Sequence, residues 1–285
     1  MKYVLSLLLF LQSIKSISQK KIEFRLSPSI GISNNKTSWS ISGDLNGNNP
    51  DYLSELVWRN VNFSYGLQAS ITLENLSLNM SISSSRTFKG IVSDIDYTAN
   101  GRTGINYHEQ FSSNNSNFRI IQLLPQYELY KNKLFVNVGY NHISSNNIIN
   151  HNSSVNSTYK WYVNGLQIGF KYNMKLFREF NYNVGADLLF SRYYAKADWR
   201  LRNDLKHPTS FDQIVKFNYG FSTLNSLSYS FNEKYSISLI NKLLYSIGYK
   251  GVDKAYLKSG GTLFTQVKYN EILIIENYLS LTVPF

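Results

Sequence analysis

The sequence predicts an all-β fold: a ten-stranded antiparallel transmembrane β-barrel of the outer membrane. Three observations lead to this prediction. Apolar and polar residues alternate with a period of two along many segments, Tyr and Trp gather near the ends of these segments, and short turns alternate with long polar stretches. Aromatic residues make up 15% of the 285 residues, far more than a disordered chain carries, so the chain is expected to be ordered.

The N-terminus has the pattern of a secretory signal peptide. Lys2 precedes an apolar run over residues 4–11, and Ser16 and Ser18 occupy the small-residue positions before a cleavage site. The run is too short to span a bilayer as a helix. We therefore expect a signal peptide over 1–18 and a single β-barrel domain over 19–285. A buried strand is the alternative interpretation of the same run.

Residues 55–74 show the alternation most clearly. One parity is mostly apolar from Val57 to Leu73, and the other carries Asn, Ser, Gly, Gln and Thr. Side chains alternate faces along a strand, so the segment has one apolar and one polar face. The pattern recurs over 76–82, 134–140, 166–172, 184–190, 235–249 and 273–285. A soluble sandwich also alternates. Long strands, a second face that is polar throughout and aromatic residues at strand ends favour lipid outside and water inside.

The connections give the strand number. Short turns are expected near 74–75, 131–133, 175–180 and 232–234, and long polar loops over 33–53, 84–116, 142–160, 194–212 and 249–263. Four turns alternating with five loops give ten strands. In bacterial outer-membrane barrels the turns face the periplasm, so the five loops are expected to be extracellular.

Residues that could do chemistry lie in the second and fourth loops. Asp94 and Asp96 point the same way if their segment is extended, and two close carboxylates resist joint ionisation, so one can hold a proton near neutrality. The fourth loop carries Asp198, Asp204, His207 and Asp212, and an imidazole beside a carboxylate can act as a general base. Four strand steps separate the loops in a ring of ten, which places them nearly opposite across the mouth. Solvated loop side chains are the alternative interpretation.

Other functional classes lack support in the sequence. There is no cysteine, which excludes thiol nucleophiles, thiolate metal sites and disulfides. The four histidines have no zinc-binding spacing, so neither a metal nor a cofactor is predicted. The formal charge of +11 favours phosphate-rich surfaces, but the Lys and Arg residues form no stripe. We therefore expect outer-membrane lipid rather than nucleic acid as a partner, and a monomer.

The chain resembles the omptin family of outer-membrane endoproteases. The segment Ser54-Glu55-Leu56-Val57-Trp58-Arg59 is similar to the family's Ser-x-Leu-x-Trp-Lys stretch, and Asp94-Ile95-Asp96 to its water-binding Asp pair. Glu276-Asn277-Tyr278 and the final Phe285 are similar as well. Strand number, loop order and length agree over essentially the whole mature chain.

The resemblance implies an aspartic-type endopeptidase that cleaves polypeptides at the outer face. A water molecule is activated between the Asp pair and an Asp/His couple of the fourth loop, with no covalent intermediate. Asp94 and Asp96 match the family pattern directly. The fourth loop has Asp204-Leu205-Lys206-His207 where the family has Asp-x-His, so a bulge is needed to bring Asp204 to His207.

The resemblance also suggests two binding residues. Omptins have an acidic residue that selects a basic side chain on the N-terminal side of the cleaved bond. Trp39 occupies the matching position in this chain, so Trp39 is the substrate-binding candidate. A preference for Arg or Lys is therefore not expected. Tyr140 matches the family's lipopolysaccharide-binding cluster, in which His142 and Ser144 replace charged residues. Tyr140 is therefore the lipid-binding candidate.

Two other functions remain open at this point. The altered fourth loop is compatible with a catalytically decayed barrel that acts as an adhesin or surface-binding protein. The polar inward positions are compatible with a small pore or a lipid-acting barrel.

Overall fold

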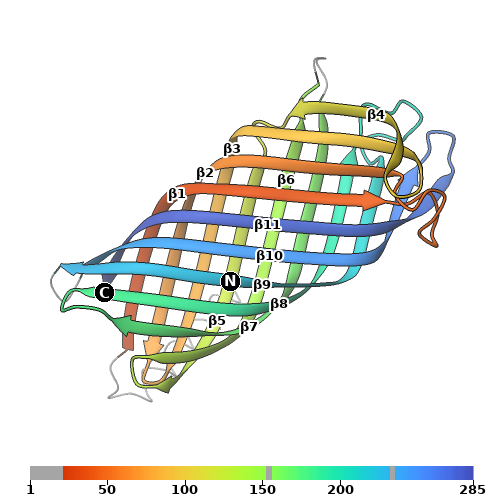
Figure 1. Ribbon diagram of the computed structural model, residues 1–285. Helices are drawn as coiled ribbons and strands as arrows, with labels where there is room; N and C mark the ends of the chain where they lie inside the picture. The colour runs from red at the N-terminus through yellow and green to blue at the C-terminus, as the bar shows by residue number, and fades with distance from the viewer. Residues whose placement is uncertain (1–21, 152–155, 232–234, 285) are drawn as a thin grey trace, which may run out of the picture.

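The computed structural model describes residues 22–151, 156–231 and 235–284, so the expected signal peptide and the expected turn at 232–234 lie outside the described residues. The described chain is all-β and antiparallel (Figure 1). Its strands are β1 (Ile22–Ile41), β2 (Ser54–Leu73), β3 (Leu76–Ala99), β4 (Thr103–Ser112), β5 (Asn117–Tyr130), β6 (Leu134–Ile149), β7 (Ser157–Lys175), β8 (Phe180–Asp198), β9 (Phe211–Phe231), β10 (Tyr235–Tyr256) and β11 (Thr262–Pro284). Within these described ranges, no helix is long and apolar enough to cross a membrane.

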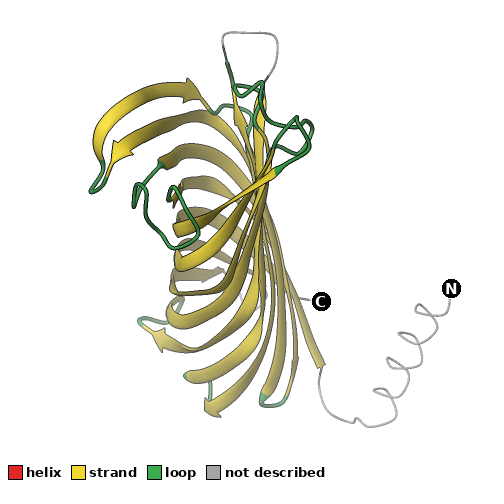
Figure 2. Cartoon of the chain, turned by 90° about the vertical axis from the view of Figure 1, so that its right-hand side faces the viewer, coloured by secondary structure: helices red, strands yellow, loops and turns green. Residues whose placement is uncertain are grey.

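Ten of the strands close into a ring. The pairing runs β2-β1-β11-β10-β9-β8-β7-β6-β5-β3, and β3 pairs back with β2. This confirms the predicted antiparallel barrel. The eleventh strand, β4, pairs with the distal part of β3 and forms a hairpin that stands away from the rest of the wall (Figures 1 and 2). The hairpin occupies the stretch 84–116, which was expected to be a loop.

The long connections are much shorter than expected. β1 continues to Ile41, β6 to Ile149, β8 to Asp198 and β10 to Tyr256, through stretches that were predicted to be loops. Most of the Asn- and Ser-rich sequence is therefore strand. Polar residues are compatible with a strand wherever the wall stands in water, so polarity alone did not mark loops here. The turns expected at 74–75, 131–133 and 175–180 are present, the last of them between Lys175 at the end of β7 and Phe180 at the start of β8.

The direction of the apolar alternation reverses along the barrel. We name the strand segments next to the short turns the turn half, and those next to the long connections the loop half; on β7 these are 165–175 and 157–164. In the turn half of β7 the outward positions are apolar, as at Leu166 and Ile168, and the inward ones are polar. In the loop half Tyr159 and Trp161 face inward, and Lys160 faces outward.

The loop half encloses a packed aromatic core. Trp58 stacks on Tyr159 with ring centroids 5.0 Å apart, and Trp39 packs edge-on to Phe211 at 5.7 Å. Each such side chain stabilises the fold by about 1.5–3 kcal/mol through burial. The expectation of a polar interior along the whole barrel is therefore wrong for the loop half. There the outer wall meets water, so the apolar side chains pack inside.

The turn half has the surface expected in lipid. Large apolar side chains form an outward belt, and the inward positions carry mainly Ser, Asn, Gln and Thr. Belt members include Ile30, Phe63, Tyr65, Ile82, Val138, Leu166, Ile168, Leu188, Phe221, Leu239 and Leu279. The predicted alternation of lipid-facing and inward residues holds in this half.

Candidate functional site

The predicted carboxylate pair lies on β3, in the loop half and beyond the lipid-facing belt. Asp94 pairs in register with Leu56 of β2 and with Glu109 of β4, and Asp96 pairs with Ser54 and Tyr107. Directly opposed residues of an antiparallel pair share a face. Asp94 and the fully buried Val92 are two residues apart on β3 and therefore point to the same face, which is directed into the barrel. Two strand residues separated by one have Cα atoms about 6.5 Å apart, which is close enough for their charges to interact.

The two carboxyl groups have different surroundings. Asp94 is 5% exposed. Burial, followed by repulsion from Asp96 and Glu109, raises its pKa to about 8. Burial also raises the pKa of Asp96, but the Ser54 hydroxyl and the positive charge of Arg202 act in the opposite direction. The site therefore tends to keep a proton on Asp94 and the negative charge on Asp96.

The histidine of the fourth connection pairs with an acid other than the expected one. His207 Nδ1 lies 2.6 Å from Asp198 Oδ1, and Arg200 Nε donates to the second oxygen of Asp198 at 2.8 Å. Asp204 is bound by Arg202, with 2.6 Å between Nη2 and Oδ2, and this hydrogen bond lowers the pKa of Asp204 to about 2. The expected Asp204–His207 couple is therefore wrong. The structure contains an Asp198–His207 couple instead.

This couple belongs to the outer side of the barrel wall. Along the loop half of β8, Tyr193, Ala195 and Ala197 are buried inward, whereas Lys196 points outward. Asp198 continues the outward parity. The Asp94–Asp96 pair has the inward parity on β3. Within the described chain, no hydrogen bond or ion pair joins His207 to either carboxyl group.

Arg202 is the residue of the fourth connection that acts on the carboxylate pair. Burial raises the pKa of Asp96, and the charge of Arg202 opposes this rise; the pKa of Arg202 is itself raised, first by its hydrogen bond to Asp204 and also by the charge of Asp96. Leu205 is buried in the core, and the backbone N–H of Lys206 donates to the Tyr256 carbonyl at 2.8 Å. The connection thus crosses from β8 to the end of β10 and carries Arg202 toward β3.

The two predicted binding residues have different surroundings. Trp39 is 3% exposed and is enclosed by Tyr159 and Phe211 in the core of the loop half. Its expected contact with substrate is corrected to a packing role, because the ring is covered. Tyr140 is outward and 44% exposed, and its hydroxyl donates to Asn164 Oδ1 at 2.9 Å. That position is compatible with lipid contact.

Sequence reasoning missed Glu109 beside Asp94 and Arg202 near Asp96, and it noted Asp198 in the fourth loop without assigning it as the partner of His207. Asp198 was visible as an acid nine positions before His207, at the end of an alternating segment. The other two depend on the β3–β4 hairpin and on the path of the connection. Across the described residues, no cluster of three or more His, Cys, Asp or Glu side chains is arranged to hold a metal ion.

Several known proteins resemble this chain. The model of the family described as Protochlamydia outer membrane protein matches residues 72–283. No curated protein matches it. Among solved structures, the outer membrane protease OmpT of Escherichia coli is similar with a TM-score of 0.70 at 11% identity, over 92% of this chain and 97% of that one. Neisserial surface protein A has a TM-score of 0.37 at 10% identity, over 93% and 100% of the two chains.

The likeness to OmpT is a likeness of fold, because 11% of positions are identical. The similarity to omptins thus extends from the sequence motifs to the architecture of the whole barrel, and it does not show that the chain is an omptin. The family match covers well over half of the chain. The chain belongs to the Protochlamydia outer membrane protein family and is a β-barrel of the outer membrane of a Gram-negative bacterium.

Proposed function

We propose that this barrel is a cell-surface endopeptidase of the aspartic type, in which Asp94 and Asp96 form the acid–base pair. The observation that carries the proposal is the contrast between their surroundings: Asp94 is buried beside two other carboxylates, and Asp96 is near Arg202. Two carboxyl groups whose environments separate their pKa values suit the roles of acid and base. The fold shared with OmpT adds support from architecture alone.

In the proposed reaction a water molecule is held between the two carboxyl groups. The Asp96 carboxylate takes a proton from this water as the oxygen attacks the peptide carbonyl carbon, and protonated Asp94 gives its proton to the carbonyl oxygen. As the C–N bond breaks, Asp96 passes its proton to the leaving amine, and Asp94 recovers one from a hydroxyl of the intermediate. Arg202 favours the ionised form of Asp96 throughout.

His207 has a supporting role in this scheme. It is bound to Asp198 on the outer side of the wall, where it holds the connection that carries Arg202. This role differs from the one that the omptin resemblance implies, in which the histidine acts on the water. The proposal therefore assigns proton transfer to Asp94 and Asp96, and a positioning role to Asp198 and His207.

The test is cleavage of fluorogenic peptides by protein refolded in detergent with lipopolysaccharide. Asp94→Asn is expected to lower kcat/KM at least about 100-fold, the effect of losing acid–base assistance. His207→Ala, and Asp204→Asn, which removes the carboxylate that binds Arg202, are expected to lower it less than about tenfold. Absence of turnover above that of Asp94→Asn would refute the proposal. A loss with His207→Ala as large as with Asp94→Asn would refute the assignment of roles.

The pH dependence gives a second test. Asp94 works in its protonated form, so activity is expected to fall as the pH rises through about 8. The folded state holds this proton more tightly than the unfolded chain, so stability falls as the pH rises from the ordinary aspartate value to about 8. At pH 9 Asp94→Asn is therefore expected to unfold at higher urea than the parent while being inactive. If the variant unfolded at lower urea than the parent at pH 9, the buried surroundings assigned to Asp94 would be contradicted.

A second candidate function is surface binding without catalysis. The observation that favours it is the outward position of the Asp198–His207 couple, which leaves the omptin-like constellation incomplete. This function predicts adhesion of barrel-coated particles to extracellular matrix proteins, with no change for Asp94→Asn. If neither the parent nor the variant adheres, this alternative fails.

Lipopolysaccharide is part of the proposal as a lipid partner. The outward Tyr140 supports it, because its ring stands at the level of the lipid-facing belt with its hydroxyl held by Asn164. Tyr140→Ala is the corresponding variant. It is expected to raise the lipopolysaccharide concentration needed for activity without changing the pH profile.

A further inference from the structure

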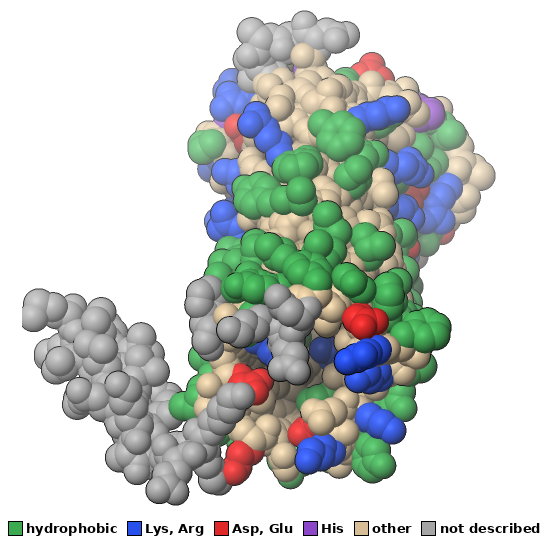
Figure 3. All heavy atoms as spheres, turned by 90° about the vertical axis from the view of Figure 1, so that its left-hand side faces the viewer, with side chains coloured by type: hydrophobic (Ala, Val, Ile, Leu, Met, Phe, Trp, Pro, Cys, Tyr) green, Lys and Arg blue, Asp and Glu red, His purple; other side chains and the backbone are tan. Residues whose placement is uncertain are grey.

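The turn half contains a large polar cavity that the proposed function does not use. Its volume is about 970 Å³, in the range of sites for small organic ligands. Seen from the turn end, the barrel is hollowed, with Lys and Arg side chains visible inside (Figure 3). Its lining includes Lys131, Lys133 and Lys175, which lie at the turns, so the cavity opens at that end. Since short turns face the periplasm in such barrels, the opening is periplasmic.

The inner end of the cavity is closed. Ile120, Leu244 and Ile274 line it there, and all three belong to the packed core that continues into the loop half. Trp58, Tyr159 and the other aromatic residues fill the interior beyond them. The cavity is thus a cup with one mouth. This closure argues against the small pore considered from the sequence.

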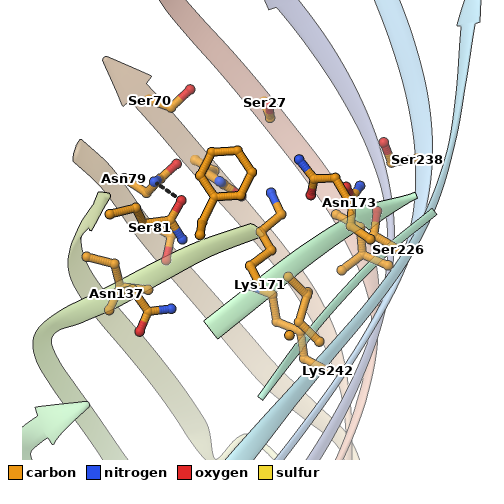
Figure 4. A pocket seen from close by; sticks show the side chains of 18 of the residues that line it. Ser27, Ser70, Asn79, Ser81, Asn137, Lys171, Asn173, Ser226, Ser238 and Lys242 are labelled. Atoms are coloured by element: carbon orange, nitrogen blue, oxygen red, sulfur yellow. Dashed lines mark hydrogen bonds between the residues drawn. The ribbon is translucent and has the colours of Figure 1, made fainter. Parts of the chain in front are cut away.

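The walls are rich in groups that form hydrogen bonds with hydroxylated molecules. Ser, Thr, Asn and Gln side chains line the cavity from all sides, and several appear around Lys171 in the close view (Figure 4). Some of these groups are engaged with one another: Asn79 Nδ2 donates to Gln126 Oε1 at 2.9 Å, Gln122 Nε2 donates to Gln167 Oε1 at 3.1 Å, and the hydroxyls of Ser27 and Thr282 and of Ser228 and Ser238 are paired at 2.8 Å. Other lining side chains, among them Gln68, Ser70 and Thr72, have no hydrogen bond to another described side chain and can bind a ligand.

The charges in the cup favour an anion. Two acids, Asp187 and Glu276, line it, and they are outnumbered by the basic side chains Arg25, Lys131, Lys133, Lys171, Lys175 and Lys242. Lys171 and Lys242 are half-buried, and no hydrogen bond or ion pair joins either of them to another described residue, although Glu276 lies opposite Lys242 in the strand register. A partly desolvated ammonium group without a partner is a favourable site for an anionic ligand.

We propose that the cup binds a hydroxylated anion from the periplasm, namely a small sugar that carries a carboxylate or a phosphate. Lys171 and Lys242 hold the anionic group, and the amides and hydroxyls of the wall bind the sugar hydroxyls. Phe135 lies opposite Lys171 in the strand register and offers an apolar surface for the sugar ring. The proposal concerns a site separate from the Asp94–Asp96 pair, at the other end of the barrel.

Isothermal titration of the refolded full chain tests this inference, with digalacturonate, glucose 6-phosphate, maltose and inorganic phosphate as probes. At least one anionic sugar is expected to bind at least about tenfold more tightly than maltose and than inorganic phosphate. The two anionic sugars distinguish carboxylate from phosphate recognition. Equal binding of maltose or of inorganic phosphate would overturn the proposal, as would absence of binding by both anionic sugars.

Variants locate the binding. Lys171→Gln with Lys242→Gln is expected to weaken it at least about tenfold, whereas Lys258→Gln, a matched change of an exposed lysine at the loop end, leaves it unchanged. Lys171→Arg with Lys242→Arg keeps the charges, serves as a second folded variant and is expected to bind within a few-fold of the parent. Asp94→Asn is expected to bind as the parent does. Unchanged binding by the double Gln variant would refute the site.

Discussion

The turn half and the loop half of this barrel are built from the same ten strands with opposite polarity. In β7, Leu166 and Ile168 face outward in the turn half, whereas Tyr159 and Trp161 face inward in the loop half. In β8, Leu188 is outward and Ala195 is inward in the same way. The difference shows that the medium outside the wall decides what fills the interior. Where lipid lies outside, the interior is lined mainly by polar side chains; where water lies outside, most of the interior is filled by packed apolar side chains.

The two halves are consequently stabilised in different ways. The loop half buries a core of its own, as a soluble domain does, and gains from packing and the hydrophobic effect. In the turn half the inward side chains surround a cavity, so stability there depends on the hydrogen-bonded ladder and on the match of the outer belt to lipid. Variants placed at equivalent inward or outward positions can measure this contrast.

The largest effect is expected from the core of the loop half. Trp58→Ala removes a fully buried ring that stacks on Tyr159 and should cost about 3–5 kcal/mol in the free energy of unfolding, measured by urea titration in detergent. The control is Ser64→Ala, an inward change on the same strand. A cost of Trp58→Ala below about 1 kcal/mol would show that the loop half is not a packed core.

A smaller effect is expected at the outer wall. Leu166→Arg places a charge in the lipid-facing belt and should destabilise the barrel in lipid vesicles by about 2–4 kcal/mol. The matched change Tyr162→Arg, an outward position of the loop half on the same strand, is expected to cost less than about 1 kcal/mol. If both substitutions cost the same, the boundary between the halves does not lie between these positions.

The smallest effect is expected inside the turn half. Ser64 Oγ donates to Ser33 Oγ at 2.9 Å, and Ser64→Ala removes this neutral hydrogen bond together with a contact to the Tyr278 hydroxyl. We expect a loss of about 1 kcal/mol, because a neutral hydrogen bond contributes about that much on balance. The same urea titration measures it. A loss comparable with that of Trp58→Ala would mean that the polar network stabilises its half as strongly as the aromatic core does.

The sequence predicted the barrel because period-two alternation is a local property that survives in every strand. For the same reason it predicted which residues of the turn half face outward into lipid, for example Leu166. It did not reveal the reversal. The apolar positions of β7 change from odd at Tyr159 and Trp161 to even at Leu166 and Ile168, but the stretch 142–160 was expected to be a loop, so this change was not interpreted as part of one strand. The Asn- and Ser-rich stretches were expected to be loops because the outer wall of the loop half, like a loop, is in water.

The candidate site was predictable only in part. Asp94 and Asp96 share a face through strand geometry, which their spacing contains. The Asp198–His207 couple depends on how the connection 199–210 turns at the end of β8, and the position of Arg202 depends on its anchoring at Tyr256. Neither is encoded in a short motif. The omptin pattern placed the partner of His207 at Asp204, because family spacing assumes a loop of the same path.

The β3–β4 hairpin leaves one strand outside the closed ring. Over most of its length β4 pairs on one side only, so main-chain N–H and C=O groups along its other side face water. Such an exposed margin can recruit a strand from another molecule. β4 is ten residues long and carries His108, Glu109 and Gln110 near the middle of that margin. Short length and polar side chains are the means by which natural proteins discourage edge-to-edge association, so this exposed strand is protected against aggregation.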